Sequence, residues 1–367
     1  MTNSTLDEYS SALGKEVVVD SVDKELRLLW EEDKASSNAS LMNLAVYSEE
    51  ADAILKNSEI VQSITREHAC RAILIGIDRD ASEASIRAWI TAHCHLSQQG
   101  SKSICCEQVA FQLTGRATGR LRNTVFAHLN SDLPLVFWWQ GELSDIFVER
   151  LYSLIDRFIF DSSEWSDPLS SLQRINEMLD DGTELAPMDI EWTRSYQARV
   201  ALAALFDDPL AAQALEHTQQ IRIVVHPNHR MAGMQILAWI VQSTGWQRSP
   251  DLGLCGDQNH SDTEDRFYFE THEGSDVTAR VVCDPTSAAV GLVELSSSDC
   301  VVKVFRESDS AYMHQQLEAG GHRIDRLIPS ASDDAAELVG DQLARGGKNT
   351  LYRTILPVYL DLLKCRD

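Results

Sequence analysis

Apolar runs and helically spaced segments alternate along the first half of the chain. Each strand-like run is followed by a segment whose apolar residues recur every three or four positions, which is typical of a helix. The strand-like runs are 41–47, 71–77 and 103–113, and the helix-like segments are 49–67, 84–96 and 119–129. This alternation predicts an α/β fold with a mostly parallel sheet covered by helices on both faces.

The stretch 133–163 shows the same pattern most clearly. An apolar run at 135–139 precedes a helical pattern, and a second apolar run at 158–160 ends before Asp161. We predict a βαβ unit at the centre of the sheet, because both runs are apolar enough to be buried on both faces. Trp138 and Trp139 should point to opposite faces of their strand. At most one of them fills a given core, and the other faces a second layer, the carboxyl-end crevice of the sheet, or a partner.

The pattern changes after residue 219. A strand at 220–226 and a helix at 230–243 precede four alternating segments, which predict an antiparallel β-meander, and two helices close the chain. We therefore expect a smaller α+β domain with an antiparallel sheet after the α/β domain. The alternating segments are 266–272, 277–283, 288–295 and 300–306, the closing helices are 333–344 and 349–364, and the expected domains are an N-terminal extension with a helix at 1–39, the α/β domain at 40–212 and the α+β domain at 213–367.

The charge balance excludes two classes of partner. The chain has 32 basic and 56 acidic residues and a formal charge of −24. Nucleic acids and anionic membranes need a basic face, so we expect neither as a partner. No apolar run approaches the roughly 18 residues of a membrane span, and the polar N-terminus does not resemble a secretory signal. A cytoplasmic protein is the expectation.

The eight cysteines are scattered and show no zinc-type spacing. They are either buried thiols or include a redox-sensing pair, for which Cys105 and Cys106 are the candidates. Because these two neighbours alternate across a strand, their thiols should not meet. We place His93 and His95 on a predicted helix, where they do not form a joint site. No metal and no cofactor is expected.

Two groups of residues could carry chemistry at the carboxyl ends of strands. Arg116, Arg120 and Arg122 follow a strand, and guanidinium groups suit phosphate, so they are anion-binding candidates. A solvated helix start, or a docking surface for an acidic partner, is the preferred interpretation. Asp161 lies where α/β enzymes place catalytic groups, but it could simply cap the next segment. No glycine-rich nucleotide loop follows any of the strands.

Several motifs resemble the glucose-6-phosphate dehydrogenase assembly protein family, OpcA. The resemblance covers about residues 40–210, and the second half matches only in the order of its elements. Gln140 and Glu191 depart from the family pattern. The motifs are MNLAVYSEE from Met42, CEQV from Cys106, LPLVFWWQGELSD from Leu133, FIFDSSEWSDP from Phe158, DIEWTR from Asp189 and LAALFDDP from Leu202.

The resemblance implies a non-catalytic protein that binds glucose-6-phosphate dehydrogenase and promotes its assembly or activation in the oxidative pentose phosphate pathway. It also implies possible redox modulation through cysteines, with thioredoxin as a further partner. Exposed aromatic residues and arginines dominate interfaces, so the partner-binding candidates are Trp138, Trp139, Arg157, Trp192 and Arg194; core packing is the alternative for each tryptophan. A second hypothesis is a sugar-phosphate-binding enzyme or sensor that uses the arginine cluster, with Asp161 as acid or base.

Overall fold

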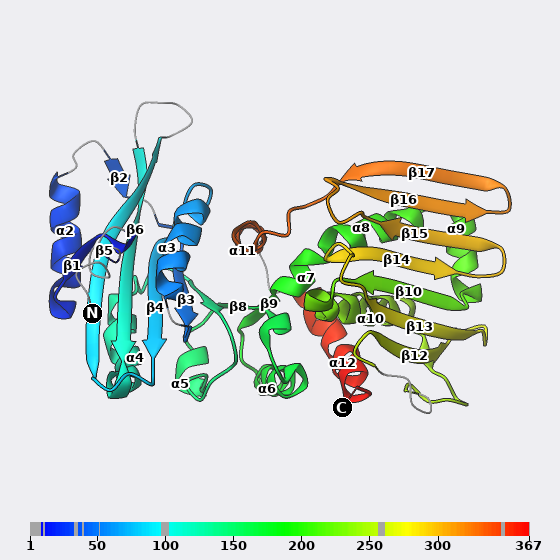
Figure 1. Cartoon of the computed structure of the whole chain (residues 1–367), viewed down its shortest axis with the longest axis horizontal. Helices are drawn as coiled ribbons and strands as arrows, with labels where there is room; N and C mark the ends of the chain where they lie inside the picture. Colours follow the sequence, from blue (N-terminus) through cyan, green and yellow to red (C-terminus); the bar gives the residue numbers. More distant parts are fainter. Residues whose placement is uncertain are drawn as a thin grey trace. The chain divides into compact units, whose positions relative to one another are not determined.

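The chain forms two compact units, and each is interrupted along the sequence. The computed structural model describes residues 9, 12–32, 36–38, 40–50, 52–96, 103–255, 261–345 and 349–366 (Figure 1). The first unit comprises Met1–Ser166, Leu179–Met188 and Ala335–Lys348, and the second comprises Asp167–Met178, Asp189–Asp334 and Asn349–Asp367. The expected boundaries at 39–40 and 212–213 therefore fall inside units, because the chain passes between the units more than once.

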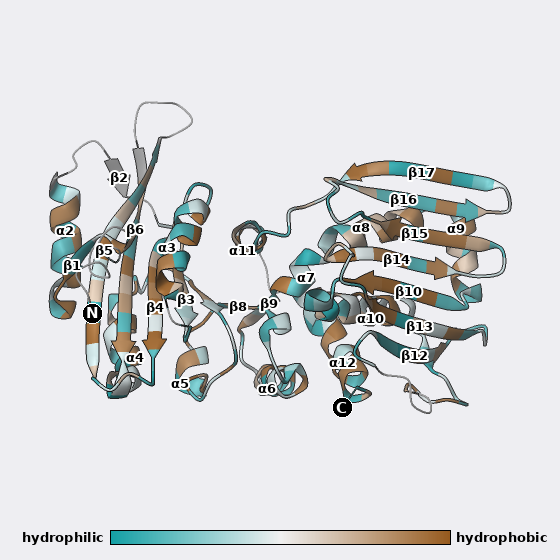
Figure 2. Cartoon of the chain, in the orientation of Figure 1, coloured by the Kyte–Doolittle hydropathy of each residue, from teal (hydrophilic) through white to brown (hydrophobic). Residues whose placement is uncertain are grey.

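The first unit is built on a mostly parallel sheet, as the alternating pattern predicts. Strands β6, β4, β3, β7 and β8 run parallel in that spatial order. At one edge β5 pairs antiparallel with β6, and β1 pairs antiparallel with β5. The central strands are buried on both faces, and β4 is brown over much of its length in Figure 2. Within the described residues the strands are β1 (Lys15–Val17), β2 (Ser36–Asn38), β3 (Asn43–Ser48), β4 (Arg71–Asp78), β5 (Ser85–Leu96), β6 (Ser103–Thr114), β7 (Leu135–Trp139), β8 (Arg157–Phe160) and β9 (Ala186–Asp189).

The helices of the first unit follow the predicted pattern with one error. The helices at 49–67 and 119–129 are confirmed in shortened form, and a helix from near the C-terminus, α11, packs against α3. The segment 84–96 is not a helix but strand β5, which pairs along its whole length with β6. Ile86, Ile90 and Thr91 are β-branched and suit a strand, and twelve paired positions override the weak helical spacing. The helices are α2 (Val22–Glu32), α3 (Ala53–Ile64), α4 (Leu121–Val125), α5 (Glu149–Tyr152) and α11 (Ala335–Ala344).

The predicted βαβ unit is present in the first unit, but it lies toward one edge of the sheet and not at its centre. Strands β7 and β8 are parallel neighbours, with Phe137 opposite Phe158. The connecting helix is only the four residues of α5, because the segment before it turns at Gly141 and then runs irregularly. Gly141 has a φ of 78°, a conformation that glycine adopts at little cost.

The second unit contains an antiparallel sheet with one parallel insertion. Strand β10 (Gln220–Val225) lies between β13 (Asp276–Cys283) and β14 (Val290–Ser296), parallel to the first and antiparallel to the second. The predicted simple meander is therefore wrong, because the first strand in sequence occupies the middle of the sheet. The other strands are β11 (Gln247–Arg248), β12 (Glu264–Glu270), β15 (Cys300–Phe305), β16 (Tyr312–Ala319) and β17 (His322–Pro329).

Helices cover one face of this second sheet. Along β12, β13, β15 and β16 every other residue is buried, and α8, α9 and α10 contact the strands. The helices are α6 (Pro168–Asp180), α7 (Ile190–Arg194), α8 (Tyr196–Leu205), α9 (Pro209–Ala214), α10 (Arg230–Thr244) and α12 (Thr350–Lys364). In the part of the chain that the structure describes, none of the helices is both long and apolar enough to cross a membrane.

Candidate functional site

The crevice at the carboxyl ends of the parallel strands is the first place to look for a site. Ligands of doubly wound sheets bind where neighbouring strands are continued in opposite directions. In the first unit this point lies between β3 and β7, because β4 and β6 follow on one side and β8 follows on the other. The segments that meet there are the β3–α3 connection, which begins at Glu49, and the turn at Gln140 and Gly141 after β7.

Carboxylates gather at this point. Glu49 binds Arg79 at 2.7 Å and accepts a hydrogen bond from the Tyr47 hydroxyl at 2.6 Å. Glu164 accepts a hydrogen bond from the backbone amide of Gly141 at 2.7 Å. Burial, and then the charges of Asp161 and Glu50, raise the pKa of Glu164. We call Glu50, Asp161 and Glu164 the acidic rim; these carboxylates would repel the pyrophosphate of a dinucleotide. In the sequence, the rim was signalled only by Glu50, in the Ser-Glu-Glu triplet that follows the first predicted strand.

Polar contacts on both sides of the Gly141 turn hold the crevice in place. Gln140 and Asn57 of α3 exchange two amide hydrogen bonds of 2.8 Å each. The indole nitrogen of Trp139 donates to the carbonyl of Glu142 at 2.9 Å, and that of Trp165 donates to the carbonyl of Gly141 at 3.0 Å. The turn is therefore anchored from the strand side and from the segment after β8.

Both members of the tryptophan pair are buried. Trp138 is 4% exposed and Trp139 is 1% exposed. Trp139 packs against Tyr47, with ring centroids 4.2 Å apart, and against Phe147 and Phe158. Neither indole is therefore a surface anchor within this unit. Because neighbouring residues of a strand point to opposite faces, the two indoles fill the core on opposite sides of the sheet. A second layer for one of them was among the predicted possibilities.

The remaining candidates of the first unit lie apart from one another. Arg116, Arg120 and Arg122 are exposed in the segment after β6 and form no ion pair within the described residues. Arg157 is half-buried at the start of β8. Asp161 accepts a hydrogen bond from the Ser163 amide at 2.9 Å, which is the capping role.

The second unit buries a polar cluster built on the DIEWTR segment. Asp189 is fully buried and accepts hydrogen bonds from Gln235 at 2.6 Å and Tyr352 at 3.1 Å. Glu191 is also fully buried, and one of its oxygens binds Arg194 at 2.7 Å and His229 at 3.0 Å. Burial opposes the charge of Glu191, but His229 and Arg194 lower the pKa of its carboxyl overall.

Two further candidates, Trp192 and Arg194, belong to the same DIEWTR segment. Trp192 is 5% exposed and carries the guanidinium of Arg199 over its ring at 3.2 Å. Arg194 also donates to the carbonyl of Asp333 at 2.9 Å. Both side chains therefore stabilise the interior of the second unit. Among the described residues no group of three or more His, Cys, Asp or Glu side chains could hold a metal ion.

Four cysteines form two disulfides. Cys94 and Cys105 lie opposite each other on β5 and β6 and are bonded, so the partner of Cys105 is Cys94 and not Cys106. His93 and His95 consequently flank Cys94 on a strand and not on a helix. Burial raises the pKa of the Cys106 thiol, which makes this thiol a poor nucleophile.

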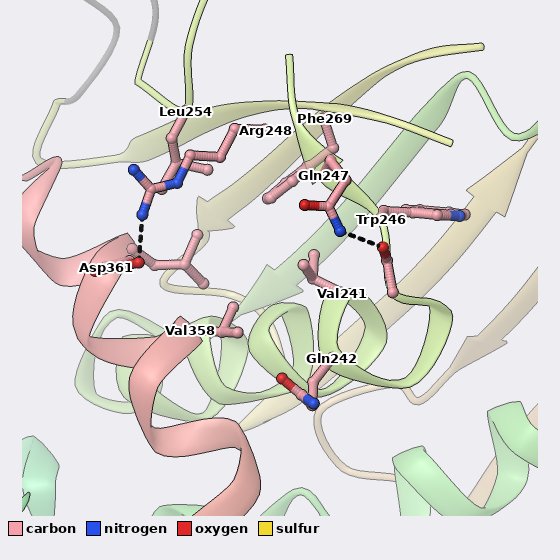
Figure 3. Close-up of a pocket in the computed structure, with 11 residues that line it drawn as sticks. Val241, Gln242, Trp246, Gln247, Arg248, Leu254, Phe269, Val358 and Asp361 are labelled. Carbon is pink, nitrogen blue, oxygen red and sulfur yellow. Dashed lines mark hydrogen bonds and ion pairs between the residues drawn. The ribbon is translucent and has the colours of Figure 1, made fainter. Parts of the chain in front are cut away.

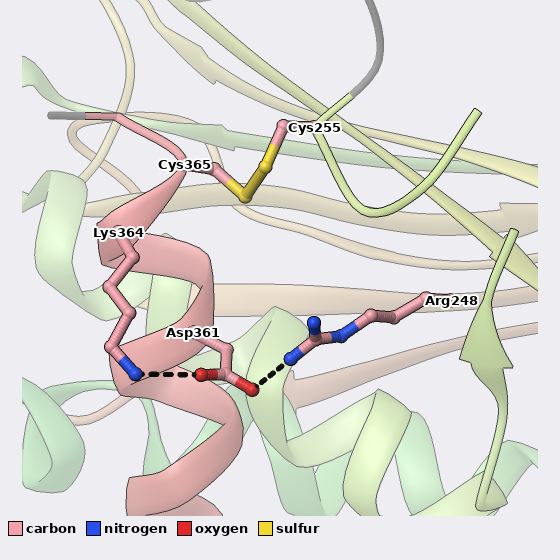
Figure 4. The surroundings of a disulfide bond; sticks show 5 residues. All are labelled: Arg248, Cys255, Asp361, Lys364 and Cys365. Atoms are coloured by element: carbon pink, nitrogen blue, oxygen red, sulfur yellow. Dashed lines mark hydrogen bonds and ion pairs between the residues drawn. A yellow bond between two sulfur atoms is a disulfide. The ribbon is translucent and has the colours of Figure 1, made fainter.

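The second disulfide lies beside a pocket. Cys255 is bonded to Cys365, just beyond the last turn of α12, and Asp361 of α12 binds both Arg248 and Lys364 (Figure 4). The pocket next to it measures about 320 Å³ (Figure 3). Its lining mixes apolar side chains with Gln242, Gln247 and the Arg248–Asp361 ion pair. The lining includes Val241, Gln242, Trp246, Gln247, Leu254, Phe269, Val358 and Leu362.

Comparisons with known proteins place this architecture. A family model described as the glucose-6-phosphate dehydrogenase subunit N-terminal domain matches residues 61–177, and the corresponding C-terminal domain model matches residues 186–356. A Nostoc punctiforme protein named as an OxPP cycle protein, OpcA, is 24% identical over 321 residues, or 83% of this chain and 67% of that protein. Its namesake from Synechococcus elongatus is 23% identical over 325 residues, or 85% and 72%.

One solved structure supports the same assignment of fold. Glucose-6-phosphate 1-dehydrogenase from Mycobacterium avium superposes with a TM-score of 0.51 at 12% identity, over 88% of this chain and 90% of that chain. At this identity the likeness concerns the fold alone. The class is therefore an α/β protein of dehydrogenase-like fold, whose sheet crevice carries carboxylates at the switch point. The chain belongs to the OpcA family of glucose-6-phosphate dehydrogenase assembly proteins, which confirms the resemblance seen in its motifs.

Proposed function

We propose that this chain is a non-catalytic partner protein that binds glucose-6-phosphate dehydrogenase and promotes its assembly or activation. The descriptions of both matching family models name that enzyme, and the models follow each other in order along the chain. The relatives in the two cyanobacteria are named for the OxPP cycle. A protein that acts on a dehydrogenase of this pathway is consistent with all of these names.

The acidic rim is the structural observation that supports a partner role most directly. In a dinucleotide-binding sheet the first turn carries glycines that let the pyrophosphate approach the backbone. In this chain the corresponding connection carries Glu50, and Glu164 accepts the backbone amide of Gly141 beside it. A dinucleotide would meet negative charge at the place where the fold normally holds its phosphates, so a role outside hydride transfer is favoured.

The experiment is to mix the purified chain with the glucose-6-phosphate dehydrogenase of its own host. Comigration in size-exclusion chromatography reports binding, and the rate of NADPH formation reports activation. We expect a shared peak and a higher rate or a larger enzyme oligomer. Absence of comigration and of any rate change, in both oxidised and reduced samples, would rule the proposal out.

We further propose that this interaction depends on the redox state of the chain, with thioredoxin as a reductant. Cys94 is exposed on its strand, whereas its bonded partner Cys105 is buried, and Cys255 and Cys365 are both half-buried. Exposed sulfur atoms are the ones that a thiolate can attack. The dehydrogenase rate measured with the wild-type chain should change when reduced thioredoxin is added. The C94S and C365S variants, which lack one disulfide each, should respond less to thioredoxin than the wild type. An equal response of the wild type and both variants would contradict this part of the proposal.

A second candidate function rests on Arg116, Arg120 and Arg122. These exposed guanidinium groups follow β6 at the carboxyl edge of the sheet, where anionic ligands of α/β proteins bind. A sugar-phosphate sensor would use them as its anion site. Calorimetric titration with glucose 6-phosphate and 6-phosphogluconate tests this function; heat that disappears in Arg120→Ala supports it, and a flat titration removes it.

A further inference from the structure

One row of side chains crosses the uncovered face of the second sheet. The cross-strand register aligns one residue from each of seven strands, from β12 at one side to β17 at the other. Arginines occupy the first three places, on neighbouring strands. The row reads Arg266, Arg280, Arg222, Glu294, Lys303, Gln316 and Asp325, and these side chains point away from the face that packs against α8, α9 and α10.

The three adjacent arginines, which we call the arginine row, are unfavourable for the isolated sheet. Like charges directly opposite each other on neighbouring strands are destabilising. Arg266 is paired with Glu264 at 2.7 Å. Arg222 faces Glu294 across the strands and lies within electrostatic range of Asp284. Within the described residues, however, the side chains of Arg222 and Arg280 form no hydrogen bond and no close ion pair. Arg222 is exposed and Arg280 is half-buried. In a chain with a formal charge of −24, such a local concentration of positive charge requires an explanation.

An apolar row lies beside the arginine row on the same face. Val282, Val224, Leu292 and Phe305 are in register across neighbouring strands, and the row continues to His314 and the 60% exposed Leu327. The ring of Phe305 stacks on His314 with centroids 4.5 Å apart and carries the Lys303 ammonium at 5.6 Å. Arginine next to aromatic and aliphatic surface is the composition of a protein interface core.

We propose that this open sheet face, with the arginine row at one side, docks an acidic surface of the partner protein. The proposal rests on the proposed function and names the surface through which the dehydrogenase would be bound. Seven strands about 4.8 Å apart and about seven residues long present roughly 700–800 Å², which matches the approximately 800 Å² that each partner contributes to a standard interface. A flat face of this size can bind a macromolecule, whereas a small anion on it would remain exposed to solvent.

Charge complementarity selects an acidic partner over a second copy of this chain. A two-fold axis parallel to the strands through β14 would place Arg222 against Lys303 of the second copy, and Glu294 against itself. An axis perpendicular to the strands would place each arginine against its own equivalent. The first arrangement also places Arg266 against Asp325, which is its one pairing of opposite charges. Both arrangements nevertheless set like charges face to face, which costs affinity. A row of carboxylates opposite the arginine row avoids this repulsion and neutralises Arg222 and Arg280.

The test is charge reversal on the open face with a matched control on the same sheet. Arg222→Glu with Arg280→Glu reverses the two arginines of the row that form no close ion pair. Arg326→Glu is the control: Arg326 is exposed on β17 and follows Asp325, so it lies on the opposite face of the same strand. Affinity for the host's glucose-6-phosphate dehydrogenase is measured by surface plasmon resonance at low and high salt. Circular dichroism and the thermal midpoint check folding, and Arg222→Gln with Arg280→Gln serves as a neutral pair if the reversed pair does not fold.

We expect the reversed pair to lose at least tenfold in affinity, and the Arg326 variant to stay within twofold of the wild type. The wild-type affinity should fall as salt rises, and the affinity of the reversed pair should depend less on salt. Wild-type affinity in the folded reversed or neutral pair overturns the assignment of this face and leaves the proposed function standing. A wild-type chain that does not bind the dehydrogenase overturns the proposed function, and this assignment with it.

Discussion

The Cys255–Cys365 disulfide should dominate the stability of the second unit. It joins residues 110 apart in sequence, whereas Cys94–Cys105 joins residues 11 apart. In the chain-entropy description, a cross-link stabilises by restricting the unfolded chain, and the effect grows with the logarithm of the closed loop. At 25 °C this gives about 4.8 kcal/mol for the longer loop and about 2.8 kcal/mol for the shorter one. Removing the first should therefore cost about 2 kcal/mol more than removing the second.

Urea unfolding of oxidised wild type, Cys365→Ser and Cys94→Ser measures this difference. The two units can unfold in separate transitions, so hydrogen exchange of α12 and of β6 assigns each transition to its unit. We expect Cys365→Ser to lower the midpoint of the second unit more than Cys94→Ser lowers that of the first. An unchanged midpoint in Cys365→Ser, or equal losses of free energy in the two variants, would refute the loop-entropy reasoning.

Three further variants probe the interior of the two units. Trp139→Ala should cost about 3–5 kcal/mol in the free energy of unfolding because a large side chain leaves the core; a loss below about 1 kcal/mol would show that the crevice wall closes over the gap. Glu191→Ala strands Arg194 in a buried site, so urea unfolding should show a loss of about 3–5 kcal/mol, and a neutral result would contradict a buried ion pair. Burial lowers the pKa of His93 below its usual 6.5. The unfolded chain then binds more protons, so the free energy of unfolding should fall as pH drops below about 6.5, and His93→Gln should flatten this pH dependence; an unchanged slope would speak against the neutral buried ring.

Local patterns predicted the parallel sheet well, since its strands are short, apolar and separated by helices. They failed where distant partners decide the structure. Segment 84–96 carries enough alanine and polar residues to fit a helix, and only its pairing with β6 makes it a strand. Strand β10 inserts between β13 and β14, an arrangement that local patterns do not specify. The βαβ unit was recognised, but the length of α5 was not.

The candidate site was predicted less well than the fold, for a related reason. Trp138, Trp139 and Trp192 are the most conspicuous residues in the sequence, and all three are buried. The arginine row was invisible, because Arg222, Arg266 and Arg280 become neighbours only once the strand order is known. Cys94 was likewise separated from Cys105 by the incorrect helix. Predicting which side chains meet across strands therefore requires the strand order and register, which the sequence alone does not supply.

Helix α11 has a consequence for the synthesis of this chain. It packs against α3 in the first unit, although it lies between Ala335 and Ala344, after nearly all of the second unit. At about 5–20 residues per second a ribosome needs on the order of ten to forty seconds to proceed from the end of β8 to the end of α11. During that time the nascent first unit exposes the surface that α11 later covers. This interval is when a chaperone would be expected to bind the nascent chain.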